Sequence, residues 1–172
     1  ETLRGRRRRG RRLARRRADL KTWGASARRG PRLKQARMCT GQIVSDAREM
    51  ASRIDVQIRA LDVQNTPNVR AIRRTYSREV RQAAPTFVLA VARELLLTYG
   101  QREPAYELIR HHPAAFRAVG EGKLEELGQG IDSCWSVDSF ALPLTGPAWL
   151  AGQVTDAMIR RWALSEDVWW RR

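Results

Sequence analysis

The sequence lacks the features that mark several classes of protein. Its two cysteines, Cys39 and Cys134, are too few for a disulfide framework and too far apart for a zinc site, which favours a reducing cytoplasm. No apolar run approaches the roughly 18 residues that span a membrane, and no apolar segment follows the basic start, as a secretory signal requires. We therefore expect a cytoplasmic protein without metal or other cofactor, associated with the nucleoid if it is bacterial.

The positive charge is concentrated at the start of the chain. The net charge is +15, yet residues 1–37 contain 16 Lys and Arg side chains against two acids, which leaves a net charge of only +1 for residues 38–172. The arginine run from Arg4 to Arg17 is accompanied by only Leu3 and Leu13 as large apolar side chains, too little apolar surface to offset the entropy of ordering. The sequence thus predicts a disordered Arg-rich segment over 1–37 and a folded domain over 38–172.

Two interpretations of this basic segment remain open. It has the composition of an arm that binds nucleic acid through phosphate contacts and release of counterions. Alternatively, the chain begins with Glu1 and Met38 stands where the composition becomes ordinary, so residues 1–37 would be upstream translated sequence without a selected role.

The rest of the chain has helical periodicity and no alternating strand pattern. Met50, Ile54 and Ile58 recur at helical spacing behind Ser45, which we take as the N-cap of a first helix. Further helices are expected from Thr66-Pro67, from Pro85 to Gly100, from Pro104 to His111, over 114–119, 124–127, 136–142 and 154–162, and from Ser165. Short Pro and Gly connections between helices indicate antiparallel pairs, which either close into a bundle or stack as a solenoid. The expected fold class is all-α.

One carboxylate near the C-terminus is flanked in the sequence by tryptophans and arginines. Asp138 stands among most of the tryptophans of the chain and shortly before a group of arginines, and the residues concerned are Trp135, Trp149, Trp162, Trp169, Trp170, Arg160, Arg161, Arg171 and Arg172. A carboxylate stabilises a developing cation, aromatic faces pack on sugars or bases, and guanidinium groups bind phosphates. This combination is typical of an enzyme that acts on nucleic acid.

Four segments carry a family resemblance. They are Leu61-Asp62-Val63-Gln64-Asn65-Thr66-Pro67 with Arg70, then Arg102-Glu103 with Tyr106-Glu107-Leu108-Ile109, then Trp135-Ser136-Val137-Asp138, then Arg161 to Arg172 with its Trp-x-x-Ser-x-x-x-Trp-x-x-Arg pattern. In this order they resemble the DNA alkylation repair proteins of the AlkD type, over about residues 50–172. The resemblance implies an antiparallel stack of HEAT-like helical pairs whose concave basic face grips duplex DNA.

The resemblance also implies an activity, which is hydrolysis of the N-glycosidic bond of positively charged N3- and N7-alkylpurines. Asp138 falls on the catalytic aspartate of the family and Arg172 on its DNA-contacting arginine. Trp135, Arg171, Arg70 and Arg74 complete the set of expected DNA-binding residues. A single carboxylate suffices because a cationic base leaves without a general acid, so that stabilising an oxocarbenium-like sugar and orienting water remain. The partner is double-stranded DNA with alkylated bases, bound by a monomer.

Three departures from the family pattern keep alternatives open. Cys134 stands where the family has an aromatic residue four positions before the aspartate, and Trp135 lies about 100° away around a helix. The net charge of residues 38–172 is low for a DNA clamp. The sequence ends at Arg172, so an active-site aromatic residue from a later helix of the family pattern is absent. A helix begun at Ser165 would end after about two turns and leave Val168 and Trp169 uncovered, as in a fragment truncated on its C-terminal side. The alternatives are a non-catalytic HEAT-like scaffold that binds nucleic acid or protein, and an arginine-rich nucleic acid binder.

Overall fold

The computed structural model describes residues 32–172, with side chains from residue 41 onward. All regular structure in this range is helical, which confirms the expected all-α class. The elements are α1 (Arg32–Arg59), α2 (Thr66–Glu79), α3 (Pro85–Leu97), α4 (Arg102–Arg110), α5 (Pro113–Arg117), α6 (Glu121–Leu127), α7 (Cys134–Phe140), the π-helical turn η1 (Ala141–Thr145), α8 (Gly146–Leu150), α9 (Asp156–Ala163) and α10 (Val168–Arg171).

The first helix is longer than the sequence pattern predicts. It begins at Arg32 and not behind Ser45, and the proposed domain boundary between residues 37 and 38 therefore falls inside α1. The segment before Ser45 includes Leu, Lys, Gln, Ala, Arg and Met, which favour helix. The helix therefore continues through Ser45, which lies inside it and does not cap it. The rest of the expected disordered segment, residues 1–31, lies outside the described residues.

Proline and glycine mark several helix ends as expected. Pro67 stands in the first turn of α2, although the side chain that caps this helix belongs to Asn65, whose amide oxygen accepts a hydrogen bond from the backbone N–H of Asn68 at 3.0 Å. Pro85 opens α3, and Gly100, with φ of +69°, follows its end. A left-handed backbone at this position suits glycine, because other residues meet steric strain there.

The region after α7 departs from the prediction. The helix expected to end at Leu142 continues through η1 into α8, despite Pro143 and Pro147. Proline removes a backbone donor and normally interrupts a helix. Here one turn widens, and the backbone N–H of Gly146 donates to the carbonyl of Ala141, five residues earlier.

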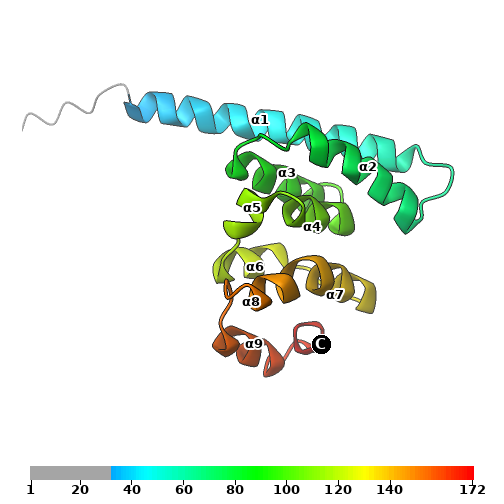
Figure 1. The fold of residues 1–172 in the computed structure, drawn as a ribbon, viewed down its shortest axis with the longest axis vertical. Coiled ribbons are helices and arrows are strands. Elements are labelled where there is room, and N and C mark those ends of the chain that lie inside the picture. The colour runs from blue at the N-terminus through cyan, green and yellow to red at the C-terminus, as the bar shows by residue number, and fades with distance from the viewer. Residues whose placement is uncertain (1–31) are drawn as a thin grey trace, which may run out of the picture.

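The helices follow one another along the molecule in chain order. Figure 1 shows α1 and α2 at one end, then α3, α4 and α5, then α6, α7 and α8, and finally α9 with the C-terminus at the other end. The packing agrees, since α1 contacts α3, α3 contacts α4, and α4 contacts both α7 and η1. The finer assignment to a HEAT-like solenoid remains a prediction.

The core runs through the centre of this stack. Helix α4 contacts helices on both sides of it, and its residues are therefore essentially inaccessible to solvent at Ala105, Tyr106, Leu108 and Ile109. No helix within residues 32–172 combines the length and the apolar character that crossing a membrane requires.

The last helices leave large apolar side chains in contact with solvent. Val168 is exposed, as expected, whereas Trp169, which we expected to be uncovered, is partly buried against the core. Other exposed apolar side chains in this region are Leu142, Trp149, Leu150 and Leu164.

Candidate functional site

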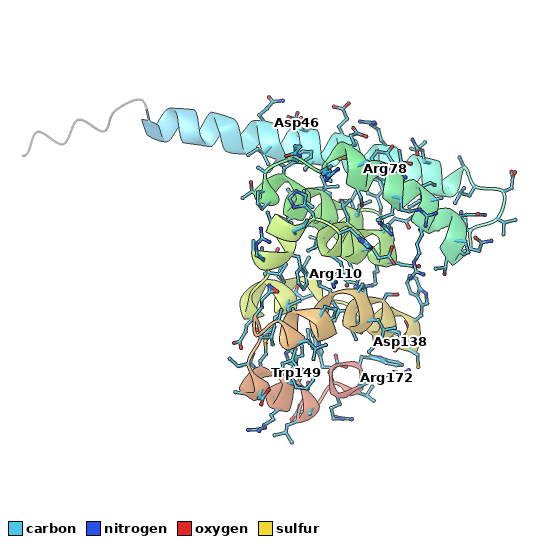
Figure 2. The ribbon with its side chains drawn as sticks, viewed as in Figure 1. Asp46, Arg78, Arg110, Asp138, Trp149 and Arg172 are labelled. Atoms are coloured by element: carbon cyan, nitrogen blue, oxygen red, sulfur yellow. The ribbon has the colours of Figure 1, made fainter. Side chains whose placement is uncertain are left out.

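Asp138 and Arg172 meet at the surface of the molecule. Nη2 of Arg172 lies 3.5 Å from Oδ1 of Asp138, and the two side chains remain 45% and 54% exposed. Figure 2 shows the pair side by side, with Asp138 on α7 and Arg172 at the C-terminal end of the chain. The resemblance assigns both residues to one DNA-binding site, which predicts that they lie close together, and the structure brings them into contact. The concave face that the resemblance also implies stays a prediction.

The start of α7 fixes the direction of Asp138. Oγ of Ser133 accepts a hydrogen bond from the backbone N–H of Ser136 at 3.2 Å, and Oγ of Ser136 accepts one from the backbone N–H of Ser133 at 3.0 Å. Val137 and Phe140 are buried against the core. Asp138 therefore lies on the solvent side of the helix, with Cys134 one turn before it.

Arg172 is held in place through the short helix α10. Oδ1 of Asp167 caps this helix by accepting a hydrogen bond from the backbone N–H of Trp169 at 2.8 Å. The ring of Trp170 packs at 4.9 Å from that of Trp162 and at 6.1 Å from that of Phe140, measured between centroids. These aromatic contacts anchor α10 close to α7. Arg172 is the residue directly after α10, so it is held close to α7 as well.

Arg171 has a different environment from Arg172. Its Nη1 donates to the backbone carbonyls of Ser165 at 2.7 Å and of Glu166 at 2.9 Å, which ties the loop before α10 together. The guanidinium group that reaches Asp138 is that of Arg172. Of the two adjacent arginines expected to contact DNA, Arg171 has a structural role in the free protein.

The aromatic residue expected beside the aspartate is replaced by a thiol. Free cysteines are usually buried as small apolar residues, so we expected Cys134 to fill part of the core. The prediction is wrong, because Cys134 is exposed, and its Sγ lies 2.6 Å from Nη1 of Arg172. Trp135 is 57% exposed and lies one position further around the helix. The surface formed by Cys134, Asp138 and Arg172 is therefore not the one that Trp135 occupies.

The arginines of α2 divide into two groups. Nε of Arg70 lies 2.7 Å from Glu107 and 3.2 Å from Glu103, and Nε of the buried Arg73 lies 3.0 Å from Glu107. These pairs join α2 to α4, and burial raises the pKa of Glu103 although Arg70 opposes this effect. Arg74 is exposed, and within the described part of the chain no carboxylate pairs with it. Arg74 therefore remains free to bind a phosphate, whereas Arg70 is already engaged.

Two residues that position the site escaped the sequence analysis. Gly128 lies against the ring of Trp170 so closely that a Cβ atom there would approach Cη2 at 2.5 Å, and Phe140 packs between Tyr106 and Trp170. Both contacts join residues distant in the sequence. A glycine after Leu127 reads as an ordinary helix end, so no local signal identifies it.

The comparisons with known proteins add no relative. No family model, no curated protein and no solved structure matches this chain. Among the described residues, no three His, Cys, Asp or Glu side chains gather in a way that would hold a metal ion.

Proposed function

We propose that this chain acts in DNA alkylation repair, as an AlkD-like glycosylase with a HEAT-like arrangement of its helices. Its substrate would be duplex DNA that carries a positively charged N3- or N7-alkylpurine, and its reaction the hydrolysis of the N-glycosidic bond. The observation that carries the proposal is the contact of 3.5 Å between Asp138 and Arg172. Asp138 lies on α7 and Arg172 directly follows α10, and the motif order assigned both to the same site.

Asp138 would act on the sugar. As the cationic base departs, positive charge develops on the deoxyribose, and a carboxylate next to it stabilises that charge. Because the base is already cationic, no general acid is needed to protonate it. The exposure of Asp138 leaves room for the sugar and for the attacking water.

Arg172 would bind the DNA backbone next to the lesion. Its guanidinium is partly exposed, and phosphate oxygens would compete with Asp138 and Cys134 for its N–H donors. Exposed arginines elsewhere, such as Arg74, would add contacts that position the duplex without reading its sequence. The expected assembly is one protein monomer on one duplex.

The direct test is base release by the full chain. A duplex with a single N7-methylguanine is incubated with the protein, and the free base is quantified by chromatography against the spontaneous loss without protein. We expect faster release from the methylated duplex and none from the unmodified one. Release at the spontaneous rate, with the protein bound to the DNA, would refute the catalytic part of the proposal.

One observation favours a second function, that of a non-catalytic scaffold that binds nucleic acid or protein. Cys134 stands where an aromatic side chain would pack on the sugar, and it contacts Arg172 directly. A scaffold would bind methylated and unmodified duplexes equally and release no base. The same assay thus separates the two functions.

A further inference from the structure

A partly open pocket of about 300 Å³ lies between the α7–η1–α8 segment and helices α9 and α10. Its wall is largely apolar and includes five aromatic rings, which belong to Phe140, Trp149, Trp162, Trp169 and Trp170. Nε1 of Trp149 donates to Oδ1 of Asp156 at 2.8 Å, which fixes that wall although the ring is 43% exposed. The size is at the lower end of the range of about 300–1,000 Å³ found for ligand pockets.

One residue that lines the pocket has an unsatisfied polar group. Thr145 lines it, is only 8% exposed, and its Oγ1 is buried without a hydrogen-bond partner. A buried hydroxyl group without a partner is costly unless a ligand or water completes it. Thr145 also ends the π-helical turn η1, and such turns occur frequently at functional sites.

Two arginines lie at the rim of the pocket, and Asp138 stands next to one of them. Arg171 and Arg172 contribute to the lining, and no carboxylate does. The guanidinium of Arg171 donates to backbone carbonyls. That of Arg172 is partly exposed beside Asp138 and Cys134, so an anionic group of a ligand would meet Arg172 by exchanging with these side-chain contacts. The pocket thus offers flat apolar walls, one buried hydrogen-bonding group and a cation at its mouth.

We propose that this pocket binds the base of a purine nucleotide, with the phosphate of that nucleotide on the guanidinium of Arg172. Aromatic side chains stack on bases, and arginine binds phosphate through several N–H donors. Oγ1 of Thr145 forms a hydrogen bond with an edge of the base.

The proposal rests on the proposed glycosylase function where it concerns DNA. A base in the pocket and a phosphate on Arg172 leave the sugar between them, at the rim where Asp138 contacts Arg172. In a duplex, this arrangement requires that the nucleotide leave the base stack. Proteins of the AlkD type, which the sequence resembles, are noted for excising the base without fully extruding it, so the pocket predicts a different mode of recognition for this chain.

The first experiment measures binding of adenosine 5′-monophosphate to the full chain by tryptophan fluorescence, with ribose 5-phosphate as the probe that lacks a base. We expect saturable quenching by the nucleotide and at least tenfold weaker binding of the sugar phosphate. Equal affinities would overturn the proposal, because they would show a phosphate site on Arg172 alone.

Substitutions at the pocket wall test whether the base of the nucleotide binds there. Ala163→Phe adds a ring at the pocket wall, and we expect it to weaken nucleotide binding at least tenfold. Ala71→Phe, on the exposed side of α2, is the matched control and leaves binding unchanged. Thr145→Val replaces the hydroxyl with a methyl group and should weaken binding about fivefold, whereas Thr145→Ser keeps the hydroxyl and should retain the affinity. Thermal melting verifies that each variant folds, and unchanged affinity in folded Ala163→Phe and Thr145→Val would overturn the proposal.

A last arm separates a free nucleotide from a nucleotide within DNA. Duplexes with and without one unpaired adenine are compared, and Ala163→Phe should lower affinity only for the duplex with the unpaired base. If both affinities stay unchanged, the extrahelical mode is wrong. Alkylpurine release that is insensitive to Ala163→Phe would likewise refute the pocket but leave the glycosylase function standing. Nucleotide binding without any base release would refute the glycosylase function but leave the pocket.

Discussion

Replacing Gly128 with alanine should displace the helix that carries Arg172. Gly128 follows α6 with φ of −84° and ψ of −3°, a conformation open to alanine, so the substitution introduces no backbone strain. The new Cβ would lie 2.5 Å from Cη2 of Trp170 and 3.1 Å from Cζ of Phe140. Carbon atoms in contact prefer about 3.5–4.0 Å, and the indole ring must therefore retreat by about 1 Å or more.

The cost follows from overpacking. Forcing one additional methyl group into a packed site typically destabilises a protein by about 1–3 kcal/mol. For a chain of this size each kcal/mol corresponds to a melting temperature about 2–4 °C lower. Because Trp170 lies two residues before Arg172, its retreat should also move Arg172 away from Asp138 and reduce base release.

Urea unfolding measures the cost, and two controls isolate its cause. Gly122→Ala, inside the same helix, meets no atom within 4 Å and should stabilise the protein by about 0.5–1 kcal/mol. In a Trp170→Ala background the approach to the indole ring is absent and only the milder one to Phe140 remains, so Gly128→Ala should then cost clearly less than in the parent chain. An equal cost with and without Trp170 would refute this reasoning, as would a Gly128→Ala variant as stable as the parent chain.

Three further predictions concern other parts of the molecule. Tyr106→Phe should lower the free energy of unfolding by about 1–2 kcal/mol in urea titrations, because the buried hydroxyl donates to the carbonyl of Leu127 at 2.8 Å. Partial burial, aided by Arg73, lowers the pKa of His111. The stability linked to its neutral form is therefore present above pH 6.5 and is lost as the pH falls through the lowered pKa. In thermal melts, His111→Gln should lose less stability than the parent between pH 7 and pH 5. Removing residues 1–31, which leaves α1 intact, should flatten the dependence of log K on log salt by several units if this segment binds DNA, at about 0.9 per phosphate neutralised, whereas identical slopes would show that it takes no part.

Helix ends marked by local chemistry were predictable. Pro85 and Gly100 bound α3 because proline fits a first helical turn and glycine tolerates positive φ, and both effects depend on the residue alone. The helix predicted over 136–142 has the wrong end, because it continues past Leu142 into a wider turn that accommodates Pro143. Whether a proline ends a helix or is absorbed by a wider turn depends on the packing around it, which local sequence does not contain.

The site was predictable only as far as residue order carries it. The order of the motifs assigned Asp138 and Arg172 to one site, and the structure shows that the two side chains are in contact. The role of Arg70 was not accessible, because its partners Glu103 and Glu107 lie on another helix and only the fold turns them toward α2. The same holds for the pocket, whose walls come from segments that are far apart in the chain.

The central claim is that Asp138 stabilises the departing sugar, and the most direct test is single-turnover release of N7-methylguanine by Asp138→Asn. This variant keeps the size of the side chain and removes its charge, so it should bind the duplex as the parent does but release base about 10²- to 10³-fold more slowly. Asp62→Asn, on the exposed loop after α1, is the control and should match the parent rate. An undiminished rate with Asp138→Asn would contradict the account.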